Sequence, residues 1–81
     1  METRVALISM IVQDQESALE INALLHAYRQ YIIGRMGIPY APKKISIISI
    51  AIDAPQDIIS ALSGKLGALR GVSAKTVYSK V

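Results

Sequence analysis

The sequence predicts an α+β fold of the ferredoxin-like kind, in which two helices cover one face of a four-stranded antiparallel sheet. Two nearly continuous apolar runs, Val5–Val12 and Ile45–Ile52, indicate buried strands, and each is followed by a helix-start signal. Two weaker β-prone segments complete the order strand, helix, strand, strand, helix, strand. At this length we expect residues 1–81 to form a single domain.

The N-terminal part of the chain predicts a central strand followed by a helix. The segment Thr3–Val12 is rich in Val and Ile and is interrupted only by Ser9, which is typical of a strand covered on both faces. Asp14 then offers an N-cap, and apolar residues at helical spacing predict a helix from about Gln15 to Arg29.

The middle of the chain predicts a hairpin made of one edge strand and one central strand. Tyr31–Ile38 is β-prone but contains two glycines, and we expect Pro39 to end it, so it is an edge strand. Tyr40–Lys44 is the expected loop, and the apolar run Ile45–Ile52 is the second central strand.

The last third predicts a second helix and a final edge strand. Asp53 is an N-cap candidate, Pro55 suits the first helical turn, and Asp57 complements the helix dipole. An apolar stripe at helical spacing follows, and Val72–Ser79 is the last strand. Right-handed crossovers place the first and third strands in the centre of the sheet.

Both faces of the two central strands are apolar, although the two helices can cover only one. The other face must therefore meet another protein surface, and the simplest partner is a second copy, in a dimer or tetramer. An interface tolerates hydroxyl groups better than a core does, so the serine-bearing set is the expected interface: Ser9, Ile11, Ile47 and Ser49. The chain is small, 52% hydrophobic and free of cysteine, so association is also the expected source of extra stability.

Charge and hydropathy argue against several classes of partner. The net charge of +3 comes from basic residues spread along the chain, which predicts no direct specific DNA binding. The apolar runs are well short of the roughly 20 residues that span a membrane. No signal peptide is evident, so we expect a cytoplasmic protein.

The segment around Arg35 is the best candidate for a ligand site. Glycines on both sides leave room for a ligand, and the guanidinium group could bind a small anionic effector. The candidate binding residues are Arg35, Gly34, Met36, Gly37, Tyr31 and Tyr40. We expect a second subunit to contribute to such a site. Equally, Arg35 could be an edge-strand residue that limits aggregation or pairs across the interface, with the tyrosines and the methionine as packing.

No residue pattern predicts a catalytic or metal centre. His26 is the only histidine and cysteine is absent, so a surface histidine on a helix is the favoured interpretation, although an oligomer could bring two copies of His26 together. No acid–base pair remains once the helix-start aspartates are assigned. We therefore expect no cofactor and no enzymatic activity.

The chain closely resembles a known family in the stretch Ile-Gly-Arg-Met-Gly-Ile-Pro-Tyr at residues 33–40, in Asp-Ala-Pro at 53–55 and in Ala-Leu-Ser-Gly-Lys-Leu-Gly at 61–67. It resembles the iron-only hydrogenase system regulators. The resemblance covers nearly the whole chain and implies a small ACT-like domain, similar in fold to the C-terminal domain of the nickel-responsive repressor. It also implies a role in regulating iron-only hydrogenase maturation or expression.

Two departures limit what the resemblance implies. The nickel site of that repressor uses histidines and a cysteine, so nickel sensing does not follow for this chain, which has only His26. The chain also lacks a helix-turn-helix segment, so contact with DNA would require a partner. The leading hypothesis is a homo-oligomeric regulatory domain that binds an effector or a partner protein. The alternatives are a ligand-free interaction module and a nucleic-acid-associated regulator.

Overall fold

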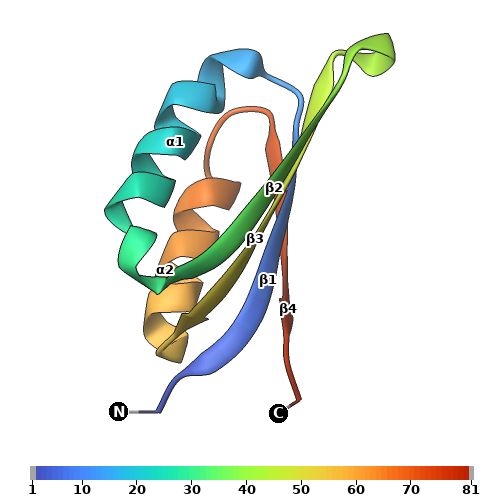
Figure 1. The fold of residues 1–81 in the computed structure, drawn as a ribbon. Coiled ribbons are helices and arrows are strands. Elements are labelled where there is room, and N and C mark those ends of the chain that lie inside the picture. The colour runs from blue at the N-terminus through green and yellow to red at the C-terminus, as the bar shows by residue number, and fades with distance from the viewer. Residues whose placement is uncertain (1, 81) are drawn as a thin grey trace.

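The computed structural model describes residues 2–80, in which the helices and strands follow the predicted order. The two helices lie side by side on one face of the sheet, and the hairpin loop between the second and third strands projects beyond them (Figure 1). The elements are β1 (Arg4–Val12), α1 (Ala18–Ala27), β2 (Ile32–Tyr40), β3 (Ile45–Ala54), α2 (Gln56–Gly67) and β4 (Val72–Tyr78). Short 3-10 turns are labelled η1 (Gln15–Ser17), η2 (Arg29–Tyr31) and η3 (Ala41–Lys43).

The sheet has the order β2-β3-β1-β4, and every neighbouring pair is antiparallel. The prediction that the two apolar runs form the central strands is therefore confirmed. In the central pair Ser9 lies opposite Ser49 and Ile8 opposite Ile50. Because side chains alternate along a strand, this register assigns each residue to one face of the sheet.

The hydrophobic core lies between the sheet and the helices. Ile8, Ile50 and Ile52 on the central strands are fully buried. They belong to one cluster with helix residues, of which the most buried are Ile21, Leu25, Ile59, Leu62 and Leu66. This cluster holds α1 and α2 against one sheet face and leaves the other face without a covering layer.

The structure corrects two predictions about element ends. Pro39 does not end the second strand: β2 continues to Tyr40, with Pro39 opposite Ser46. An edge strand accepts proline because one of its sides needs no N–H donors. Asp53 does not cap the second helix, because β3 continues through Ala54 and the N-cap residue of α2 is Pro55.

The first helix is shorter than predicted, and the predicted cap Asp14 stands before the 3-10 turn η1 rather than before α1, whose N-cap residue is Ser17. The Asp14 carboxylate accepts a hydrogen bond of 3.0 Å from the Glu16 backbone N–H, and a single 3-10 turn precedes α1. The helix ends at Ala27 rather than near Arg29, and a second 3-10 turn leads into β2. No helix within residues 2–80 is long and apolar enough to cross a membrane.

Candidate functional site

The sheet face away from the helices, called the open face below, exposes many large apolar side chains. They are Val5, Leu7, Ile11, Met36, Ile38, Tyr40 and Val77, each between 42% and 62% exposed. They come from β1, β2 and β4, and their register positions place them on the side opposite the core. On β3, Ile45 and Ile47 are half-buried members of the same face. The open face is thus a continuous apolar surface across all four strands.

The polar groups of the open face are few, and two of them share a hydrogen bond. The hydroxyl groups of Ser9 and Ser49 share a hydrogen bond of 3.1 Å at the middle of the two central strands. Asp53 on β3 and Lys75 on β4 are the charged residues at open-face positions of the described strands. Small side chains leave shallow hollows of about 250 and 350 Å³ between the larger ones.

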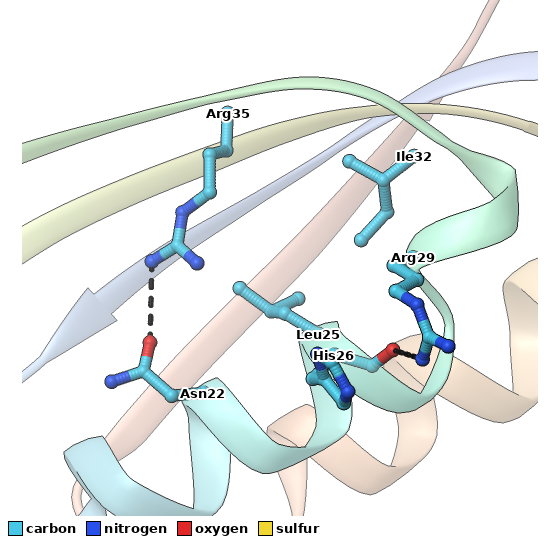
Figure 2. A pocket seen from close by; sticks show the side chains of 6 residues that line it. All are labelled: Asn22, Leu25, His26, Arg29, Ile32 and Arg35. Atoms are coloured by element: carbon cyan, nitrogen blue, oxygen red, sulfur yellow. Dashed lines mark hydrogen bonds between the residues drawn. The ribbon is translucent and has the colours of Figure 1, made fainter.

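A second candidate site lies on the helix side, between the edge strand β2 and α1. Arg35 pairs with the buried Ile50, so its side chain leaves the sheet on the helix side. Its Nη2 donates a hydrogen bond of 3.3 Å to Oδ1 of Asn22 on α1. Figure 2 shows Arg35 reaching from β2 to α1, with Leu25 and Ile32 between it and Arg29 in this view. We call this cavity of about 460 Å³ the β2–α1 cleft.

The end of α1 supplies further polar groups to the β2–α1 cleft. His26 stands in the last turn of α1, and Arg29 follows in η2. Nη1 of Arg29 donates a hydrogen bond of 3.0 Å to the His26 backbone carbonyl, which fixes the guanidinium near the helix end (Figure 2). Leu25 is buried and Ile32 is half-buried, so the cleft combines an apolar floor with a cationic rim.

The β2–α1 cleft is lined by basic groups without an acidic one. Its lining contains two guanidinium groups, an imidazole and an amide, and no carboxylate. Within the described part of the chain the one ion pair lies elsewhere, between Arg70 and Asp14, with 3.4 Å between Nε and Oδ2. Each cleft arginine therefore holds a neutral oxygen as its partner and keeps further N–H donors available.

The structure separates the residues that the sequence grouped around Arg35. Gly34 and Met36 pair with Ala51 and Ser49, which places them on the open face, whereas Arg35 lies on the helix side. Neither glycine is required by packing, because a Cβ atom at Gly34 or Gly37 would meet nothing within 4 Å.

The two tyrosines also lie apart from the β2–α1 cleft. Tyr40 ends β2 on the open face, and Tyr31 packs from η2 against the core cluster. The proposed interface residues Ser9, Ile11, Ile47 and Ser49, in contrast, all share the open face.

Sequence reasoning missed that Asn22 and Arg29 line the same cleft as Arg35. Asn22, His26 and Arg29 recur at intervals of four and three, which places them on one side of a helix, and this spacing was the available signal. Which strand that side faces depends on tertiary packing. Within residues 2–80, no three side chains of His, Cys, Asp or Glu lie close enough together to hold a metal ion.

Comparison with known proteins supports the fold and identifies relatives. Residues 4–76 match the family model "TM1266-like: Iron-only hydrogenase system regulator, putative". The solved structure of the uncharacterized protein TM1266 from Thermotoga maritima superposes with a TM-score of 0.92 at 39% sequence identity. That match covers 98% of this chain and 100% of the Thermotoga chain.

A more distant match concerns the fold alone. A formyltetrahydrofolate deformylase from Pseudomonas putida KT2440 superposes with a TM-score of 0.64 at 11% identity. The match covers 90% of this chain but 28% of the deformylase, so the shared part is one module of a larger protein. Comparison with curated proteins gave no match.

Proposed function

The chain belongs to the TM1266-like family, and we propose that it acts as a non-catalytic regulatory domain of the iron-only hydrogenase system that self-associates through its open face. The family description supports the regulatory role. The apolar open face carries the proposal of self-association, because folded monomers rarely expose so continuous an apolar surface to water.

A second copy of this chain is the partner that the open face suits best. Its two charged residues, Asp53 and Lys75, have opposite signs, so two such faces can meet without a net repulsion. They lie on strands separated by β1, so a two-fold arrangement can bring each near the opposite charge of the other copy. The hydroxyl groups of Ser9 and Ser49 share one hydrogen bond, which lowers the cost of covering them between two copies.

Two matched serine substitutions test the proposal. Ser9→Lys places an ammonium group at the middle of the open face, where it stays solvated in a monomer but would be buried and unpaired between two copies. Ser60→Lys makes the same change at an exposed position of α2 and serves as the control. Circular dichroism should show both variants folded.

Sedimentation velocity over a range of concentrations measures the outcome. We expect the wild type and Ser60→Lys to sediment as dimers or larger species, and Ser9→Lys to sediment as a monomer. A monomeric wild type at tens of micromolar would contradict self-association. A Ser9→Lys variant that remains oligomeric would show that a different surface forms the contact.

A further inference from the structure

We propose that the β2–α1 cleft binds a small organic dianion, a phosphate monoester or a dicarboxylate, with Arg29 and Arg35 as its principal ligands. The inference rests on the proposed regulatory function for its biological meaning, since it supplies the effector site of that role. It does not depend on the oligomeric state, because one chain contributes all six lining residues.

Arg29 and Arg35 have more N–H donors than their hydrogen bonds within the chain use. Each guanidinium group has five N–H donors in a planar fork that matches a carboxylate or phosphate. Arg35 uses one donor on the Asn22 amide at 3.3 Å, and Arg29 uses one on a backbone carbonyl at 3.0 Å. Both partners are neutral, so an anion in the cleft would gain charge-assisted hydrogen bonds that the free protein lacks.

No carboxylate of the described residues lines the cleft to compete with a ligand for the two arginines. The chain has six acidic residues, and none of them lines the cavity. Arg70, in contrast, pairs with the Asp14 carboxylate. Two arginines along one cavity without a carboxylate therefore produce a positive potential that favours an anionic ligand over a neutral one.

The size and the apolar floor of the cleft favour an organic ion over an inorganic one. A volume of about 460 Å³ falls in the range typical of small-molecule sites, roughly 300–1,000 Å³. Leu25 and Ile32 offer apolar surface next to the cationic rim (Figure 2). A ligand that carries anionic groups on a carbon skeleton can use both the arginines and the apolar surface between them.

The position of the cleft connects ligand binding to the rest of the fold. Its lining joins β2, the edge strand whose other side belongs to the open face, to α1, which packs on the core. A dianion held by Arg29 and Arg35 would link this edge strand to the turn η2 at the end of α1, in addition to the 3.3 Å contact between Arg35 and Asn22. Binding should therefore also stabilise the folded chain.

Nuclear magnetic resonance titration of the full-length, isotopically labelled protein tests the site. The probes are glycerol 3-phosphate, succinate and inorganic phosphate at constant ionic strength. We expect saturable shifts confined to the segment from Asn22 to Arg35, with at least one organic dianion binding more tightly than inorganic phosphate. The comparison of glycerol 3-phosphate with succinate identifies which dianionic group the site prefers.

Single substitutions separate this site from general attraction to a basic protein. Arg29→Gln and Arg35→Gln should each weaken binding by about tenfold or more, because each removes a charge-assisted contact. Arg70→Gln removes the same charge outside the cleft, where its side chain is 89% exposed, and should leave the affinity unchanged. Shifts that do not saturate, that spread well beyond the segment from Asn22 to Arg35, or that survive both cleft substitutions would overturn the proposal.

The same samples keep this proposal distinct from the proposed self-association. Sedimentation of the wild type with and without the best probe reports the oligomeric state separately from ligand occupancy. A monomer that binds the dianion would contradict self-association but leave the site intact. An oligomer without saturable binding would overturn the site alone.

Discussion

Replacing Gly71 with alanine should destabilise the domain strongly, because its backbone conformation and its close neighbour both exclude a side chain. Gly71 has a φ of +69°, in the left-handed region that costs other residues about 1–2 kcal/mol. A Cβ atom there would lie 2.6 Å from the Asp14 Cβ and 2.8 Å from the Asp14 backbone nitrogen. The Gly71 carbonyl also accepts a hydrogen bond of 2.7 Å from the Gln13 backbone N–H, so the loop has little freedom to move.

The two effects together predict a loss of about 2–4 kcal/mol in the free energy of unfolding. For a domain of this size such a loss lowers Tm by about 10 °C or more. Gly64→Ala is the matched control, since Gly64 lies within α2 and its added Cβ would meet nothing within 4 Å. That substitution should stabilise the domain by about 0.5–1 kcal/mol, because alanine favours the helix over glycine.

Urea and thermal denaturation followed by far-ultraviolet circular dichroism measure both variants. The decisive result is the opposite sign of the two changes relative to the wild type. If Gly71→Ala unfolds at the same urea concentration as the wild type or a higher one, the close contact with Asp14 described above is wrong. If Gly64→Ala is destabilised instead, the glycine serves a contact that the chain alone does not show.

Three further predictions concern one buried hydrogen bond, the core and the dispersed positive charge. Ser17→Ala should lower the unfolding free energy by about 1–3 kcal/mol in urea denaturation, because the buried Ser17 hydroxyl donates a 2.6 Å hydrogen bond to the Arg70 carbonyl; an unchanged midpoint would contradict this. Ile50→Lys should prevent folding, seen as loss of circular dichroism signal, because Ile50 is fully buried in the core; a folded variant would refute the core assignment. Fluorescence titration with labelled duplex DNA should show only weak binding that falls steeply with salt, and nanomolar, sequence-dependent binding would favour a nucleic-acid role.

The sequence predicted the layers of the fold because the chemistry of the central strands permits few alternatives. Two long apolar runs with no polar alternation had to lie in the middle of the sheet, and the order β2-β3-β1-β4 places them there. The same alternation predicted that Ser9 and Ser49 share a face, and the register places them opposite each other. The ends of the strands were less predictable. Pro39 and Asp53 lie within strands, because strand pairing in the sheet overrides their local turn and helix-cap preferences.

The candidate site around Arg35 was only partly predictable, for a physical reason. Neighbours in sequence along a strand point to opposite sides, so Arg35 and Met36 could not share a site on an extended β2. Asn22, which accepts a hydrogen bond from Arg35, comes from α1, whose rotation is fixed by the buried Ile21 and Leu25, and Arg29 follows in η2. That rotation depends on packing against the sheet, which local spacing does not specify.

The most direct test of the central claim is the native mass of the purified wild-type protein. One chain has a mass of 8.8 kDa, and we predict species at two or four times that mass, with the open face of each copy covered by another. The same spectrum would reveal a retained small anion as added mass. A spectrum with only the single-chain mass, at concentrations of tens of micromolar and under conditions that preserve a known weak dimer, would contradict self-association through the open face.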